Sequence, residues 1–171
     1  MSPSAMNTTN RRSALPFAAV VALIFLTVAL QTLAQTKEGT VDSQTKTQID
    51  GLNQKYVTSI QSNDAAQMGT VFTKDAVLVT NKGPLHGQEE IETYFGDLFK
   101  NVHVIEHWVQ ADPTTVLVLA PDKMWCNGNW CMTFELPNGK RMAQEGFWSA
   151  LEVKDGDTWK HQLLTFNVIP K

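Results

Sequence analysis

The chain has 171 residues, of which 43% are hydrophobic and 18% are charged. This balance is typical of one globular domain and excludes disordered and fibrous proteins. The 14 Lys and Arg residues are outnumbered by 17 Asp and Glu, so the charge gives no sign of nucleic-acid binding. Two cysteines, Cys126 and Cys131, are too few for a disulfide-built scaffold or a four-thiolate zinc site.

The N-terminal segment has the pattern of an export signal. Arg11-Arg12 is followed by an apolar run over 14–30 and then by Thr32-Leu33-Ala34, whose small residues suit signal peptidase. We predict a signal peptide over residues 1–34, a periplasmic or secreted mature protein, and no membrane association after cleavage. An uncleaved membrane anchor is the alternative, because the apolar run reaches the lower limit for spanning a bilayer.

Helices are predicted in the first part of the mature chain. Residues 35–44 are polar and are expected to be a disordered lead-in. Apolar residues then recur at helical spacing from Thr45, where Gln48 completes a capping box. Asn63 is placed to end this helix. Asp64 is placed to cap a second, short helix that carries Val71 and Phe72 on its apolar side.

A strand is predicted over 76–80, stopped by a turn at 81–84, and a third helix over about 88–100. After this helix the hydrophobic period changes to two. The pattern predicts antiparallel strands over 102–109, 115–119, 124–135, 140–153 and 158–168. Helices first and strands last are typical of an α+β domain with helices packed on one face of a sheet.

Several short motifs occur in the same order as in a known superfamily. They are Tyr56, Asn63-Asp64, Phe72-Thr73-Lys74-Asp75-Ala76, Gly83, Gly87, Gly128-Asn129-Trp130, Gly146-Phe147-Trp148 and Asp155-Gly156-Asp157-Thr158-Trp159-Lys160. In this order the chain resembles the SnoaL-like and ketosteroid-isomerase-like branch of the nuclear transport factor 2-like superfamily, with the domain expected over 45–171. The resemblance implies a cone-shaped α+β fold, with N-terminal helices packed on a curved, mainly antiparallel sheet and a pocket between them.

The resemblance also implies the positions of ligand-binding residues. Tyr56 falls on the tyrosine position of the steroid isomerases, and Thr80 falls where those enzymes carry a carboxylate base. Trp148 lies near the position of their second acid, and Phe166 falls on a pocket-lining position. Without the carboxylate base, steroid isomerisation by that mechanism is not expected. Tyr56, Thr80, Trp148 and Phe166 are the predicted ligand-binding residues, and a core role for Tyr56 remains the alternative.

Two further residues are candidates for proton transfer. His107 and Glu145 lie on predicted strands, and either one is able to act with Tyr56 in acid-base chemistry. His103 and His107 are four residues apart, which spans about 13 Å on a strand and is too far for a shared metal ion. We therefore predict no metal site. Phosphate-loop and dinucleotide motifs are missing from the sequence, so no cofactor is expected.

The two cysteines leave an alternative open. On a continuous strand, Cys126 and Cys131 point to opposite faces and cannot bond. If Asn127-Gly128 forms a tight turn instead, the two side chains face each other and an exported protein would oxidise them to a disulfide.

Three functions are consistent with these patterns. The first is an exported domain that binds a small, mainly apolar organic molecule in its pocket. The second is a cyclase, isomerase or hydrolase that uses Tyr56 with His107 or Glu145. The third is a dimerising module with an incidental cavity. A homodimer through the outer sheet face is expected in each case, because helices cover only one side of the aromatic-rich sheet.

Cleavage of the signal is directly testable. We expect the exported protein to comprise residues 35–171, because the small residues at 32 and 34 end the apolar run. The intact mass of protein purified from the periplasm or the medium measures this. A chain that retains Arg11 and is recovered in the membrane fraction would contradict the prediction.

Overall fold

The computed structural model describes residues 41–170, so the predicted signal peptide and the first part of the lead-in lie outside the described residues. Three helices are described: α2 (Ser43–Gln61), α3 (Ala65–Gly69) and α4 (Gly87–Asn101). The strands are β1 (Phe72–Thr80), β2 (Gly83–His86), β3 (His103–Ala111), β4 (Leu117–Ala120), β5 (Lys123–Glu135), β6 (Arg141–Asp155) and β7 (Thr158–Phe166). The predicted α+β class is confirmed.

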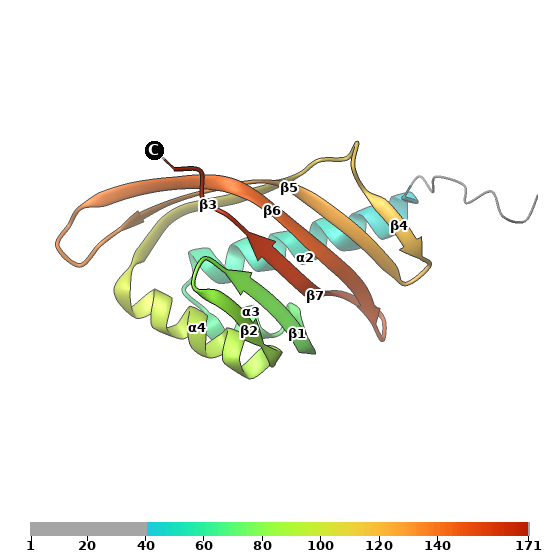
Figure 1. Cartoon of the computed structure of the whole chain (residues 1–171), viewed down its shortest axis with the longest axis horizontal. Coiled ribbons are helices and arrows are strands. Elements are labelled where there is room, and N and C mark those ends of the chain that lie inside the picture. Colours follow the sequence, from blue (N-terminus) through green and yellow to red (C-terminus); the bar gives the residue numbers. More distant parts are fainter. Residues whose placement is uncertain (1–40, 171) are drawn as a thin grey trace, which may run out of the picture. The chain divides into compact units, whose positions relative to one another are not determined.

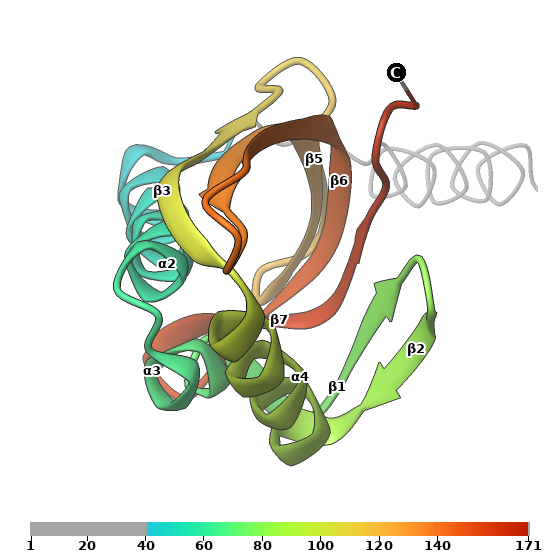
Figure 2. The same ribbon diagram turned by 90° about the vertical axis from the view of Figure 1, so that its left-hand side faces the viewer.

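The strands form one curved sheet in the order β2-β1-β7-β6-β5-β3, with β4 paired to β5 (Figure 1). All neighbouring strands are antiparallel except β1 and β7, which are parallel. Figure 2 shows how far the sheet curls and that the helices lie together near β3, β7 and β1. Although β3 and β7 are not neighbours in the sheet, both contact α2.

Helix α2 begins two residues earlier than its sequence pattern predicts. The Asp42 carboxylate accepts hydrogen bonds from the backbone N–H of Gln44 at 3.0 Å and of Thr45 at 2.9 Å. Because Asp42 caps the helix, the expected capping box at Thr45 does not form. The Gln48 side chain instead accepts a hydrogen bond from the Trp159 indole at 3.1 Å, which ties α2 to β7. The C-terminal end of the predicted disordered lead-in is therefore helical.

The connection between α2 and α3 follows the prediction. Asn63 has a φ of 55°, and the Asp64 carboxylate accepts a hydrogen bond from the Gln67 N–H at 2.8 Å. Helix α3 ends at Gly69, however, so Val71 and Phe72 do not lie on it. Phe72 is the first residue of β1 and is fully buried.

A hairpin replaces the simple turn predicted at 81–84. Gly83 and Pro84 are the start of β2, which pairs with β1. The Thr80 hydroxyl closes the turn, because it donates to the Gly83 carbonyl at 2.9 Å and accepts from the Lys82 N–H at 3.1 Å. Gly83 has a φ of 125°, a conformation that glycine adopts without steric cost.

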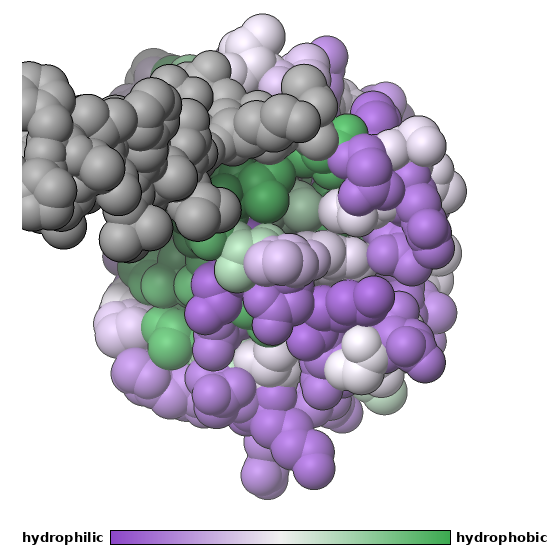
Figure 3. Space-filling view, turned by 90° about the vertical axis from the view of Figure 1, so that its right-hand side faces the viewer, coloured by the Kyte–Doolittle hydropathy of each residue, from purple (hydrophilic) through white to green (hydrophobic). Residues whose placement is uncertain are grey.

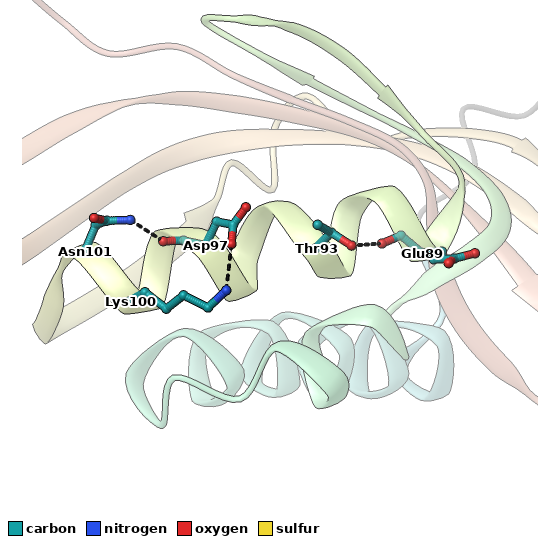
Figure 4. Close-up of polar contacts among 5 residues, drawn as sticks. All are labelled: Glu89, Thr93, Asp97, Lys100 and Asn101. Atoms are coloured by element: carbon teal, nitrogen blue, oxygen red, sulfur yellow. Dashed lines mark hydrogen bonds and ion pairs between the residues drawn. The ribbon is translucent and has the colours of Figure 1, made fainter.

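Helix α4 separates a polar face from an apolar one. On its polar side, Thr93 donates to the Glu89 carbonyl, and Asp97 contacts both Lys100 and Asn101 (Figure 4). On the other side, Ile91 and Phe95 are buried. This arrangement is that of an amphipathic helix with one face on the core.

Strand β5 resolves the cysteine alternatives. Its pairing with β6 is continuous from Lys123 to Glu135, so Cys126 and Cys131 point to opposite faces and the tight turn is wrong. Gly128, also on β5, allows the β5 and β3 backbones to lie close together. A Cβ atom at this position would lie 1.9 Å from the Gln110 carbonyl oxygen of β3, so only glycine permits this close approach of the two backbones.

The core lies between the helices and the inner face of the sheet. Its buried residues include Leu52, Ile60, Phe72, Leu78, Ile91, Phe95, Trp130, Trp148 and Leu164. Large apolar side chains remain exposed elsewhere, among them Trp108 at 41%, Leu117 at 54% and Phe147 at 55%. Figure 3 views the end of the domain at which β4 lies and shows apolar side chains gathered on part of it. No helix within residues 41–170 is long and apolar enough to cross a membrane.

Candidate functional site

A cavity of about 250 Å³ lies between α2, α4 and the inner face of the sheet. Most of the side chains around it are apolar or aromatic, including Ile60, Phe95, Val109, Trp130, Met132 and Leu164. Asn53, Asn81, Lys82 and Gln144 add polar side chains to the lining. An apolar cavity with a few polar groups is the usual form of a small-molecule site.

The Tyr56 ring lies near two histidine rings in this cavity. Tyr56 comes from α2, His107 from β3 and His161 from β7. The Tyr56 ring centroid is 5.9 Å from that of His107 and 5.9 Å from that of His161. Because β3 and β7 lie far apart in the sheet order, it is the curvature of the sheet that brings the two histidines to one tyrosine.

His107 presents a hydrogen-bond acceptor. Its Nδ1 lies 3.0 Å from the Cys131 carbonyl oxygen, which only accepts, so Nδ1 carries the proton. Nε2 is then an acceptor, and it is buried without a hydrogen-bond partner among the described residues. Burial lowers the pKa of His107 to about 4, which keeps the ring neutral at pH 7.

A bulge in β3 directs His107 inward. The register between β3 and β5 shifts between Val104 and Glu106. As a result Val104 and His107 are both buried although they are three positions apart in the sequence. A regular strand would have placed them on opposite faces.

Tyr56 presents a hydrogen-bond donor. Burial raises the pKa of its phenol well above the ordinary value of about 10, so the hydroxyl keeps its proton. This hydroxyl makes no hydrogen bond to any residue in the described part of the chain. The predicted pocket residue Tyr56 therefore lines the cavity with its donor available.

Trp148 and Phe166 also line the cavity, where they are paired on the adjacent strands β6 and β7. The Trp148 indole N–H donates to the Asn129 carbonyl at 3.1 Å. The Trp130 indole is likewise used, because it donates to the Asn167 carbonyl at 3.0 Å. These indoles therefore offer apolar surface to the cavity.

Thr80 and Glu145 do not line the cavity. The Thr80 hydroxyl is engaged in the β1–β2 turn, although the next two residues, Asn81 and Lys82, belong to the lining. Glu145 is exposed on β6, because the inward position is taken by its neighbour Gln144. The structure thus separates both residues from Tyr56.

His161 and the buried Glu152 behind it are not among the residues singled out from the sequence. Glu152 is fully buried on β6, and burial raises the pKa of its carboxyl to about 8. Burial lowers the pKa of His161 to about 4. A sequence signal exists for Glu152, because it alternates with the buried Trp148 and Ala150 along β6, but a glutamate is ordinarily expected to be exposed.

The sequence matches the model of the SnoaL-like domain family over residues 53–161. The chain belongs to the SnoaL-like family. The match spans more than half of the chain and extends from the cavity residue Asn53 in α2 to His161 in β7. Among curated proteins the sequence has no significant match.

Solved structures confirm the cone-shaped fold. The nuclear transport factor 2-like superfamily protein from Salmonella enterica is 18% identical, with a TM-score of 0.65, over 75% of this chain and 94% of that one. The ketosteroid isomerase-like protein from Erwinia carotovora is 16% identical, with a TM-score of 0.64, over 73% and 96%. A hexachlorocyclohexane dehydrochlorinase is 12% identical, with a TM-score of 0.64, over 74% and 86%. At these identities the likeness concerns the fold.

The buried histidines predict how stability depends on pH. The free energy of unfolding should decrease as the pH falls from about 6.5 to about 4, because the unfolded chain protonates His107 and His161 before the folded protein does. The steepest slope expected is about 1.4 kcal/mol per pH unit for each histidine. Urea denaturation of the wild type and of His107→Gln at several pH values measures it.

His107→Gln should have a smaller slope than the wild type over this range. The control is His103→Gln, because His103 is exposed and outside the cavity. Equal slopes for the wild type and His107→Gln would contradict a neutral, buried His107.

Proposed function

We propose that this SnoaL-like domain is an exported protein that binds a small, mainly apolar organic molecule in its cavity. The observation that carries the proposal is that the Tyr56 hydroxyl and His107 Nε2 both belong to one cavity with a mainly apolar lining. One is a donor and the other an acceptor, and neither has a hydrogen-bond partner among the described residues.

Such a pair favours a neutral ligand with one polar group. An unpartnered buried acceptor costs free energy, and a ligand that donates to His107 Nε2 removes this cost. The Tyr56 hydroxyl is suited to a carbonyl or hydroxyl oxygen on the same ligand. Trp148 and Phe166 would contact the apolar remainder. An alcohol of modest size, or a ketone in its enol form, has these properties because its hydroxyl both donates and accepts.

An enzyme of the cyclase, isomerase or hydrolase type is the second candidate, with Tyr56 and His107 as its acid-base residues. Two observations count against this assignment of roles. Glu145 is exposed and outside the cavity. His107, with a pKa of about 4, is a weak base at neutral pH, far from the optimum for general-base catalysis. The Tyr56 and His107 pair is therefore better suited to holding a ligand than to removing a proton.

Export and dimer formation are parts of the same proposal. Export rests on the signal pattern at residues 1–34, and the periplasm or the medium is the proposed location. A homodimer is supported by the outer sheet face, where no described element covers the exposed Trp108 and Phe147. Strand pairing places both side chains on the same face, since Trp108 lies opposite Cys131, Cys131 opposite Glu145, and Phe147 follows two residues later.

Binding is tested by titrating a panel of apolar ketones and alcohols while recording tryptophan fluorescence. Tyr56→Phe should weaken the binding of a responsive compound by about 0.5–1.5 kcal/mol, the usual net contribution of one neutral hydrogen bond. Glu145→Gln is the matched control and should bind like the wild type. If Tyr56→Phe changes stability but leaves affinity unchanged, Tyr56 is a core residue only.

The dimer is tested by light scattering at micromolar concentration. The wild type should have the mass of a dimer, and Phe147→Asp should shift it to a monomer, because a carboxylate would be buried in an apolar interface. Thr93→Asp, on the exposed face of α4, should remain a dimer. A monomeric wild type would rule out this interface.

A further inference from the structure

A carboxyl and an imidazole lie together behind the cavity. Glu152 on β6 and His161 on β7 are directly opposite each other in the antiparallel pair. Glu152 is 0% exposed and His161 is 2% exposed. The Glu152 Oε1 atom lies 3.7 Å from His161 Nδ1. The pair is therefore sealed from bulk solvent by the surrounding protein.

A bulge in β7 creates this arrangement. Leu151 pairs with Leu163, but the next residue, Glu152, pairs with His161, so one extra residue is accommodated in β7. His161 consequently shares the inner face with Leu164 and Phe166, which also line the cavity. The backbone thus directs the His161 side chain toward the cavity and the Glu152 side chain toward His161 Nδ1.

The polar atoms of this pair are incompletely bonded. Neither Glu152 oxygen has a hydrogen-bond partner among the described residues, nor has His161 Nδ1. Both are buried, where such atoms are costly. His161 lines the cavity and Glu152 does not. Of the two ring nitrogens of His161, Nδ1 is fully buried without a partner and Nε2 is not. Nε2 is therefore the ring nitrogen accessible from the cavity.

We propose that Glu152 and His161 form a buried proton relay that exchanges a proton with a molecule in the cavity at His161 Nε2. The proposal rests on the proposed function only in that a molecule occupies the cavity. His161 is the residue that touches this molecule, and Glu152 is a positioning residue that acts through it. Tyr56 and His107 hold the ligand and take no part in the relay.

Both groups are neutral at pH 7, because burial raises the pKa of Glu152 to about 8 and lowers that of His161 to about 4. The protonated carboxyl is then a donor, and His161 Nδ1 is its nearest acceptor. An O–H···N hydrogen bond requires the 3.7 Å separation to shorten by roughly 1 Å. The relay therefore requires a side-chain rotation that brings these two atoms together. In that state the remaining ring proton is on Nε2, so His161 is a donor toward the cavity.

Proton transfer then proceeds without placing a net charge on the imidazole. The Nε2–H bond breaks as the bond from hydrogen to a basic atom of the ligand forms. The Glu152 O–H bond breaks as the Nδ1–H bond forms. The products are a protonated ligand, a neutral His161 in its other tautomer and a Glu152 carboxylate. In the reverse direction, Nε2 removes a proton from the ligand and Glu152 regains its own.

Few other titratable groups face this pair. Cys126 lies on β5 near Glu152, and burial together with the Glu152 charge raises the pKa of its thiol to about 12. Tyr56 from α2 faces the other side of His161, with His107 of β3 beyond it. Phe72 of β1 packs on the His161 ring at 5.5 Å. The Glu152 pKa is raised by burial alone, with no contribution from a charged described residue.

The decisive experiment measures the tautomer of His161 by nitrogen NMR of the imidazole rings in the exported chain without ligand. Below the Glu152 pKa, His161 should carry its proton on Nε2. Above about pH 8 it should carry the proton on Nδ1, as the carboxylate becomes an acceptor. In Glu152→Gln this transition should disappear. Cys126→Ser, the matched control, should retain it, because the thiol does not titrate in this range.

A chemical probe tests access from the cavity. Diethyl pyrocarbonate reacts with an unprotonated imidazole nitrogen, so modification of His161 should accelerate several-fold above about pH 8 in the wild type and not in Glu152→Gln. Peptide mass spectrometry separates His161 from His107. If His161 keeps one tautomer across this pH range, or if Glu152→Gln retains the transition, the relay is overturned.

Should Glu152→Gln fail to fold, Glu152→Met provides an apolar replacement of similar length with the same expectation. Stability supplies an independent readout. Because the pKa of Glu152 is raised in the folded protein, its protonation contributes to the free energy of unfolding at low pH. This stabilisation is lost as the pH rises from about 4.5 to about 8. Glu152→Met should therefore become more stable relative to the wild type as the pH rises. A constant difference would mean that Glu152 is not protonated in the folded protein. None of these measurements uses a ligand, so they are independent of the Tyr56→Phe binding result.

Discussion

The site depends on the curvature of the sheet, because β3 and β7 must both contact α2 although two strands, β5 and β6, lie between them in the sheet. Two bulges and two glycines produce this shape locally. The register shifts in β3 and β7 turn His107 and His161 inward. At Gly128 and Gly146 a Cβ atom would lie 1.9 Å from a backbone carbonyl oxygen, of Gln110 and Asn167 respectively. Any side chain at these glycines would force the two backbone segments apart.

Burial then sets the chemistry of the site. His107, His161 and Tyr56 are all neutral in the folded protein, because desolvation outweighs the other contributions to each pKa. A ligand that brings its own charge into this lining would face the same penalty. Lys82 also belongs to the lining, but its charged side chain is exposed to solvent. The interior is therefore suited to neutral molecules that hydrogen-bond at one point.

The fold could be predicted from sequence because most of its signals are local. Residues close together in the chain determine the turn at Asn63-Asp64, the apolar face of α4 and the alternation of the long strands. The start of α2 differs from the prediction because Asp42 caps the helix in place of Thr45, and Gln48 is bound by Trp159, from the other end of the domain. Tyr56, Trp148 and Phe166 were placed in the cavity through family resemblance. His161 was not, because the bulge in β7 breaks the alternation that would relate its facing to that of Leu164 and Phe166.

Ligand recognition requires a buried imidazole with one fixed tautomer, whereas proton transfer requires one that changes tautomer. His107 fits the first requirement and His161 fits the second. His107 has its Nδ1 proton fixed by the Cys131 carbonyl, so it has one tautomer and offers one acceptor. That rigidity suits recognition, and its pKa of about 4 makes it a poor base. His161 has no such fixed partner, and its Nδ1 faces a carboxyl whose pKa is about 8. Because a proton moves between Nδ1 and that carboxyl, His161 is able to change from donor to acceptor near neutral pH while remaining uncharged. The same cavity thus combines a fixed recognition group with an exchangeable one, and the difference lies in what each Nδ1 contacts.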